Sequence, residues 1–75
     1  MTVAPPTVLW RLVKTGRDLV RAVILPGGPP YTLAFFANDE LDRVENFETI
    51  DLVIFHADEI RRSLVDDGWL EDSEK

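Results

Sequence analysis

Two arginines have the most distinctive binding chemistry in this sequence. If Lys14 pairs with Asp18 across a short loop, Arg11 falls directly opposite Arg21 in a hairpin. Like charges in directly opposite positions destabilise a strand pair, so something should relieve them. Both side chains could extend to water or pair with acids of a neighbouring strand. Alternatively, the two guanidinium groups could together hold an anion or a partner's carboxylate.

The single histidine and an acidic segment are weaker candidates for a site. His56 has no cysteine and no HExxH pattern around it, so we interpret it as a partly exposed surface residue rather than a zinc ligand or a catalytic base. Asp39, Glu40, Asp42 and Glu45 lack the ligand spacing and the glycine of a calcium-binding loop. We interpret them as a solvated acidic turn or edge strand and predict no metal site.

Neither a phosphate loop nor a catalytic nucleophile is indicated. Gly27 and Gly28 are followed by two prolines instead of Gly-Lys-Ser/Thr, so they are typical of a turn and not of a phosphate cradle. No GxSxG motif marks a nucleophilic serine. We therefore predict a protein that is not an enzyme and has no cofactor, although catalytic groups assembled from distant positions would leave no such motif.

Length and composition indicate one small folded domain. The chain has 75 residues, 45% of them hydrophobic, and contains no cysteine. A domain of this size buries only about 60–65% of its unfolded surface, so it depends on a well-packed core or on association with another chain. The N-terminus lacks the pattern of a signal peptide, and the apolar runs are far too short to span a membrane. We expect a cytoplasmic protein with no membrane partner.

The charge is divided unevenly between the two parts of the chain. Residues 1–30 contain four basic residues and one acid, a net charge of +3, whereas residues 31–75 contain four basic residues and thirteen acids, a net charge of −9. An acidic domain is repelled by phosphate backbones, which disfavours nucleic-acid binding. The basic first part keeps that function as an alternative.

A hairpin must position the two arginines. Residues 7–14 and 18–25 are rich in Val, Leu, Ile and Trp, and the intervening residues 15–17 include a glycine that suits a three-residue loop. The period of two along a strand then gives two faces. One face is entirely apolar and contains Val8, Trp10, Leu12, Val20, Ala22 and Ile24. The other face carries the two arginines together with Leu9, Val13, Leu19, Val23 and Leu25.

The middle of the chain predicts one further strand and one ambiguous segment. The prolines within residues 26–30 end the second strand, and residues 31–37 form a third strand whose faces the sequence does not assign. Residues 38–47 fit either a helix capped by Asn38 or a tight turn followed by an edge strand at 41–47. We favour the strand, because a helix here would leave only a residue or two before the next one.

An amphipathic helix is predicted over residues 49–67. Thr49 is a good N-cap, and Gly68 stands where a glycine commonly ends a helix. Apolar residues recur at helical spacing and form one stripe, which contains Ile50, Val53, Ile54, Ala57, Ile60 and Leu64. The alternative makes residues 52–55 a fifth strand and starts the helix near Ala57.

The order of these elements carries a resemblance. Trp10-Arg11, an aromatic residue before a capped helix, the segment 60–64 and Gly68-Trp69 resemble small bacterial domains in which a β-meander precedes one C-terminal helix ending in Gly-Trp. Many of those domains are uncharacterised, so the resemblance implies a fold and no activity.

The predicted fold class is α+β: an antiparallel β-meander of three to four strands with one C-terminal amphipathic helix packed on one face. Residues 1–6 are expected to form a flexible arm, 7–70 a single ββββα domain, and 71–75 a disordered polar tail.

One helix can cover only one face of this sheet, and an uncovered apolar face usually marks a partner. Two apolar residues on the polar side of the helix also lack a cover. We therefore predict a non-enzymatic protein-interaction module, either a homodimer or a subunit that docks on another protein. The candidate interaction surface consists of Leu9, Arg11, Val13, Leu19, Arg21, Val23, Leu25, Leu52 and Phe55.

Two other functions remain open at this point. The first is a domain that binds a small ligand or anion through Arg11 and Arg21, with Tyr31 as a third contact. The second is a nucleic-acid-associated protein that uses the basic N-terminal hairpin, with Trp10 as a stacking platform for a base.

Overall fold

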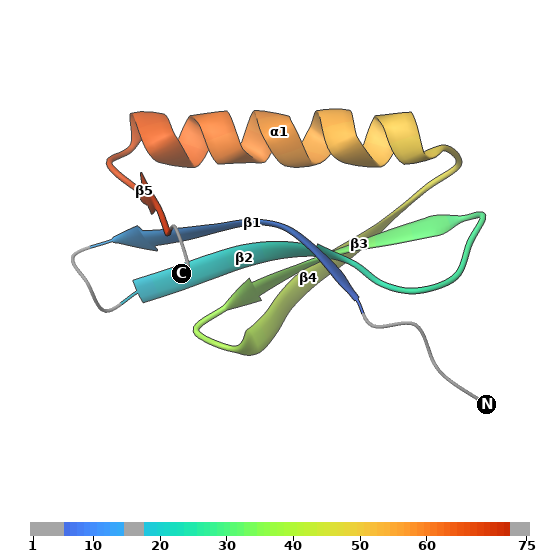
Figure 1. The fold of residues 1–75 in the computed structure, drawn as a ribbon, viewed down its shortest axis with the longest axis horizontal. Helices are drawn as coiled ribbons and strands as arrows, with labels where there is room; N and C mark the ends of the chain where they lie inside the picture. Colours follow the sequence, from blue (N-terminus) through green and yellow to red (C-terminus); the bar gives the residue numbers. More distant parts are fainter. Residues whose placement is uncertain (1–5, 15–17, 73–75) are drawn as a thin grey trace.

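A computed structural model describes residues 6–14 and 18–72 of the chain. The elements follow in the order β1 (Thr7–Lys14), β2 (Asp18–Ile24), β3 (Tyr31–Ala37), β4 (Glu40–Phe47), α1 (Ile50–Asp66) and β5 (Leu70–Glu71). In the described part of the chain, five antiparallel strands form one sheet in the order β4-β3-β2-β1-β5. The helix lies along one side of this sheet (Figure 1). The predicted α+β fold is therefore confirmed, with β5 as an additional strand, and the proposed loop at 15–17 lies outside the described residues.

A tight turn joins β3 to β4 and resolves the ambiguous segment in favour of the strand. Asn38 and Asp39 have φ angles of 52° and 69°. Positive φ at both central residues is the requirement of the mirror-image turn that connects two strands of a hairpin. Asn38 is held further by β2, because its side-chain oxygen accepts a hydrogen bond from the Leu19 amide at 2.9 Å. The alternative helix over residues 38–47 is therefore wrong.

The helix has the expected ends. The Thr49 hydroxyl oxygen accepts a hydrogen bond from the Leu52 amide at 3.3 Å. At the other end Gly68 has a φ of +107°, and the Trp69 amide donates to the Leu64 carbonyl at 3.0 Å. Both features are standard ways to satisfy backbone groups at helix termini. The predicted helix is confirmed, and the alternative strand at 52–55 is wrong.

A β-bulge in β1 changes which side chains lie on each face of the hairpin. Arg11 pairs with Arg21 as expected, but Trp10 faces Ala22 and the next pair toward the N-terminus is Val8 with Val23. Leu9 is thus the extra residue of a β-bulge, which reverses the alternation of side chains beyond it. Leu9 packs against the core on the helix side, while Val8 lies on the face of the arginines. The predicted positions of Leu9 and Val8 are wrong for this reason.

The core lies between α1 and the sheet. Its buried residues are Trp10, Leu12, Ala22, Leu33, Phe35, Val53 and Ala57. The Trp10 indole nitrogen donates a hydrogen bond to the Ala57 carbonyl at 3.0 Å, which fixes the helix on β1. Tyr31, Phe47 and Trp69 pack around this core and are partly buried.

Only part of the apolar stripe of α1 is buried against the sheet. Val53 and Ala57 are buried, and Ile60 and Leu64 pack against them. Ile54 remains 50% exposed, because successive helical residues differ in direction by about 100° and Ile54 points well away from Val53. Ile50 is 40% exposed as well. The prediction that both residues belong to the buried stripe is therefore wrong.

Candidate functional site

The face of the sheet opposite α1 is the first candidate site. Its strand pairings place side chains in two rows that cross four strands. One row consists of Val8, Val23, Ala34 and Val44, and the next of Arg11, Arg21, Phe36 and Leu41. Val13 and Leu19 form a further pair beside the arginines. We call these ten residues the arginine face.

The arginine face is apolar and open at its margins. Val23 and Ala34, in the middle of the sheet, are buried. At the two ends of the rows Val8, Val44 and Leu41 are 47%, 47% and 56% exposed. Large apolar side chains exposed together on one surface are typical of a site of contact with another molecule.

Each arginine of this face has a carboxylate partner. Arg11 Nη2 lies 3.1 Å from Asp72 Oδ2, and Arg21 Nη2 lies 3.3 Å from Asp39 Oδ1. The Arg21 guanidinium also stacks 4.6 Å from the centre of the Phe36 ring. The expected repulsion is thus relieved by acids, but these come from the β3–β4 turn and from the chain after β5. Among the described residues, these two arginines and two aspartates balance one another in charge.

The segment after the helix differs from the expected polar tail. Glu71 belongs to β5, which pairs with β1 at Leu12 and Val13. The Asp72 amide donates a hydrogen bond to the Arg11 carbonyl at 2.9 Å. A disordered tail that begins at residue 71 is therefore wrong for these two residues. The rest of the predicted tail, 73–75, and residues 1–5 of the predicted arm lie outside the described residues.

Trp10 and Tyr31, which the two alternative functions assigned to binding sites on the hairpin, do not lie on the arginine face. Trp10 is buried under the helix, so it offers no surface on which a base could stack. Tyr31 pairs with Phe47 and packs against the core on the helix side, away from the two arginines. Leu25, which was predicted as part of the protein-interaction surface, follows the last residue of β2 and is half-buried, and its amide donates to the Thr32 carbonyl at 3.0 Å.

A hollow of about 290 Å³ lies on the arginine face, lined by Val8, Arg11, Leu19, Arg21 and Asp39. It is the place where an anion could reach both guanidinium groups. Such an anion would have to replace the carboxylates that already contact them. The geometry therefore gives no particular support to an anion site.

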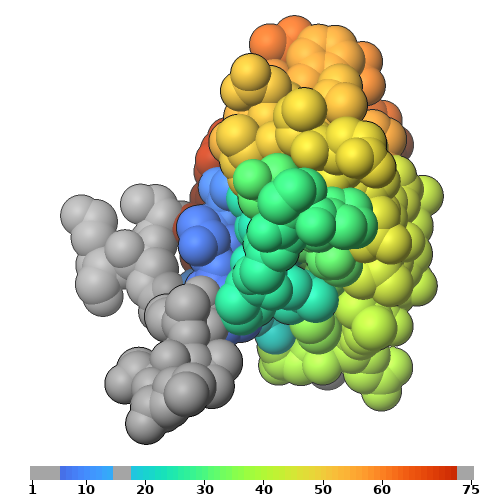
Figure 2. Space-filling model, turned by 90° about the vertical axis from the view of Figure 1, so that its right-hand side faces the viewer, coloured from blue at the N-terminus to red at the C-terminus, as the bar shows by residue number. Residues whose placement is uncertain are grey.

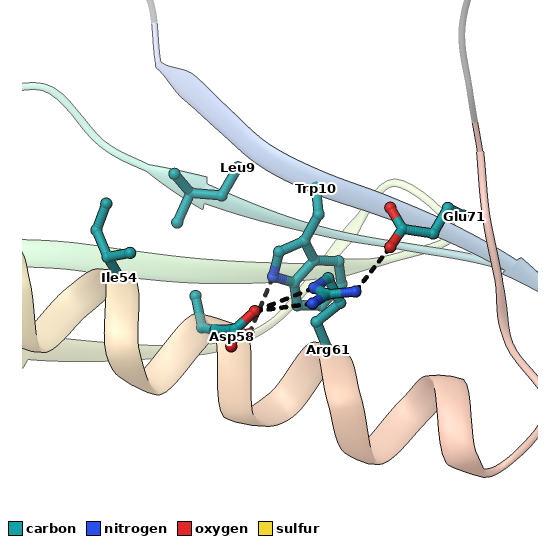
Figure 3. A pocket seen from close by; sticks show the side chains of 7 residues that line it. Leu9, Trp10, Ile54, Asp58, Arg61 and Glu71 are labelled. Carbon is teal, nitrogen blue, oxygen red and sulfur yellow. Dashed lines mark hydrogen bonds and ion pairs between the residues drawn. The ribbon is translucent and has the colours of Figure 1, made fainter.

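A second pocket, which the sequence did not indicate, lies between α1 and the edge of β1 (Figure 3). It has a volume of about 360 Å³, and its lining residues are Leu9, Trp10, Ile54, Ala57, Asp58, Arg61 and Glu71. The only local signal for it is the helical spacing of Ile54, Asp58 and Arg61, which puts them on one flank of α1. The contribution of Leu9 depends on the bulge, and that of Glu71 depends on β5.

Ion pairs form the polar side of this pocket. Arg61 donates to Asp58 Oδ1 from Nη2 at 2.9 Å and to Glu71 Oε2 from Nη1 at 2.7 Å, so it ties β5 to the helix (Figure 3). Arg62 Nε lies 2.9 Å from the other oxygen of Asp58, in the i, i+4 pair expected from the sequence.

The hydrogen bond from Arg61 is the main cause that lowers the pKa of Asp58 below its ordinary value of 3.8, and Arg62 adds to it. The same contact raises the pKa of Arg61. Asp58 and Arg61 therefore both stay charged at neutral pH.

These contacts make the stability dependent on pH through Asp58. Because its pKa is lowered in the folded protein, its contribution is present above the pKa of the unfolded chain and is lost as the pH falls through the folded value. We expect Asp58→Asn to be less stable than the wild type at neutral pH, and the difference to shrink as the pH falls below the ordinary aspartate pKa and through the lowered pKa of Asp58. Urea unfolding at a series of pH values measures this difference. Glu59→Gln, in the middle of the same helix and without an ion pair to a described residue, serves as the control and should change the stability little.

His56 and the acidic segment show no metal site. His56 Nε2 lies 3.1 Å from Glu45 Oε1, and its ring packs 5.3 Å from the centre of the Phe47 ring. Asp39 is engaged by Arg21. Across residues 6–14 and 18–72 no group of three His, Cys, Asp or Glu side chains is arranged to hold a metal ion. Within the same residues, no helix has the length and apolar character that a membrane span requires.

Comparison with known proteins assigns no family to this chain: no family model, curated protein or solved structure matches it. The resemblance to small bacterial domains therefore stays a prediction. The function has to be argued from the surfaces themselves.

Proposed function

We propose that this protein is a non-enzymatic interaction module that pairs with a second copy of itself through the arginine face. The observation that carries the proposal is the row of apolar side chains that crosses the sheet on the side away from α1. Its ends, Val8 and Val44, and the neighbouring Leu41 are about half exposed in the single chain. Full burial of a Val or Leu side chain contributes about 1.5–3 kcal/mol, and about half of that remains to be gained at each of these three side chains on each copy.

The charge of this face favours a second copy as the partner. The whole chain has a net charge of −6, so most approaches of one copy to another are repulsive. On the arginine face, by contrast, the charges of Arg11 and Arg21 are balanced by Asp72 and Asp39. Two copies that meet here bring neutral surfaces together. A two-fold axis also requires only one self-complementary patch, which this single face supplies.

The shape of the face fits sheet-on-sheet packing. Two sheets pack face to face about 10 Å apart, with side chains of both inner surfaces between them. The arginine face offers Val, Leu and Phe side chains from neighbouring strands for this purpose. For a chain of 75 residues, such a second layer would add a core that one helix cannot provide.

Sedimentation velocity at protein concentrations from about 1 to about 100 µM tests the proposal. We expect the wild type to form dimers in this range and Val44→Asp to remain a monomer, because the substitution puts a carboxylate into the apolar row. The matched control is Phe55→Asp on α1. It adds the same charge at a side chain that is 63% exposed, and it should leave the dimer intact.

Two results would contradict the proposal. A wild type that stays monomeric over the whole concentration range would exclude a dimer of useful affinity. If Phe55→Asp dissociated the dimer and Val44→Asp did not, the contact would involve α1 instead of the arginine face.

The two other functions gain no comparable support. An anion at Arg11 and Arg21 would compete with the aspartates already bound there. Base stacking on Trp10 is prevented because that ring is covered by α1.

A further inference from the structure

The outer surface of α1 has an apolar group that neither the core nor the proposed dimer uses. Leu52 is 50% exposed and Phe55 is 63% exposed, and the two side chains lie three residues apart on neighbouring positions of the helix surface. Figure 2 shows the helix, yellow to orange, raised at the top of the molecule with the strands below it. The helix therefore lies on the opposite side of the sheet from the arginine face.

Carboxylates surround this apolar group. On a helix, residues three and four apart are neighbours, so Phe55 lies next to Asp51, Leu52, Asp58 and Glu59. Of these acids, Asp58 is paired with Arg61 and Arg62. Asp51 and Glu59 are exposed, and no ion pair joins either of them to a described residue. Glu48, immediately before the helix cap, is likewise exposed and has no ion pair to a described residue. No described cation neutralises these three carboxylates, in contrast to the paired charges of the arginine face.

We infer that the outer surface of α1 docks a cationic amphipathic segment of another protein: a helix with an apolar stripe flanked by lysines or arginines. Its apolar residues would cover Leu52 and Phe55, and its cations would pair with Asp51 and Glu59. Charge complementarity selects this partner. A second copy of the chain does not fit, because two such surfaces would bring carboxylates against carboxylates. An anionic membrane is repelled for the same reason.

The docking surface on α1 does not depend on the proposed dimer, because all of its residues belong to one copy of the chain. If the arginine faces of two copies do meet, the two helices point outward on opposite sides. The dimer then offers two equal docking surfaces, and a partner with two cationic segments gains in apparent affinity.

A synthetic helical peptide of leucine and lysine, about 15 residues long with its leucines on one face, is a suitable probe. Fluorescence anisotropy measures its Kd for the full chain. We expect Leu52→Gln/Phe55→Gln, which changes no charge, to weaken binding by at least about tenfold. Asp51→Asn/Glu59→Gln should also weaken binding and should reduce its dependence on salt. Val44→Gln, on the arginine face, is the matched control and should bind as the wild type does.

Several outcomes would overturn the inference. These are no binding of the lysine peptide, equal binding of a peptide with glutamate in place of lysine, or wild-type binding by Leu52→Gln/Phe55→Gln. The last result would mean that the acids attract any cation without an apolar contact. Loss of self-association in Phe55→Gln would assign the surface to a second copy instead. Binding to phosphatidylserine vesicles that the same double variant abolishes would assign it to a membrane. Apart from the self-association of Phe55→Gln, none of these results bears on the dimer test with Val44→Asp, so the two proposals can fail separately.

Discussion

Replacement of Trp10 by alanine is expected to lower the free energy of unfolding by about 3–5 kcal/mol. A domain of 75 residues has a total stability of about 4–11 kcal/mol, so this change would bring the protein close to unfolding. Trp10 is only 8% exposed, and its ring packs 6.2 Å from the centre of the Phe35 ring. Its indole nitrogen bonds to Ala57, a residue 47 positions away, so one side chain joins the sheet to the helix.

Urea unfolding followed by far-ultraviolet circular dichroism measures this loss, since Trp69 complicates a fluorescence signal. Trp10→Phe is the informative control: it keeps an aromatic ring but leaves the Ala57 carbonyl without the indole donor. We expect it to cost about 1–3 kcal/mol, less than the alanine variant. A loss below about 1 kcal/mol for Trp10→Ala would contradict the position of the helix on β1.

Replacement of Leu33 by alanine is expected to cost about 2–5 kcal/mol. Leu33 is completely buried on the helix side of β3, where the shortened side chain leaves a cavity in a core with few residues to refill it. Val44→Ala is the matched control on β4. Because Val44 is 47% exposed on the opposite face, its truncation should cost less than about 1 kcal/mol in the monomer.

The same pair of variants separates folding from association. Thermal unfolding at a concentration low enough to keep the chain monomeric gives the stability of each variant. Sedimentation at high concentration then gives its self-association. We expect Leu33→Ala to reduce stability and Val44→Ala to reduce association. Equal losses of stability for both would mean that the two sides of the sheet are covered to the same extent.

Some features of this protein follow from its sequence alone. The helix ends are local, because Thr49 and Gly68 act on backbone groups within one turn of themselves. The pairing of Arg11 with Arg21 follows from the short distance along the chain between the two strands. The turn at Asn38 and Asp39 is favoured by residues that tolerate positive φ. Interactions between near neighbours decide all of these, so residue types and spacing are sufficient to predict them.

Other features were decided only by the tertiary structure. The bulge at Leu9 leaves no clear signal in an alternating apolar strand, yet it exchanges the faces of Leu9 and Val8 and thereby changes both candidate sites. The partner of Arg11 is Asp72, which reaches it only because β5 returns to pair with β1. Two residues of β5 have too little pattern to be recognised as a strand before β1 is there to pair with them. The sequence alone thus indicated β1 to β4 and α1 but not β5. The pairing of residues far apart along the chain decided which side chains meet, because such contacts exist only once the whole sheet and helix are assembled.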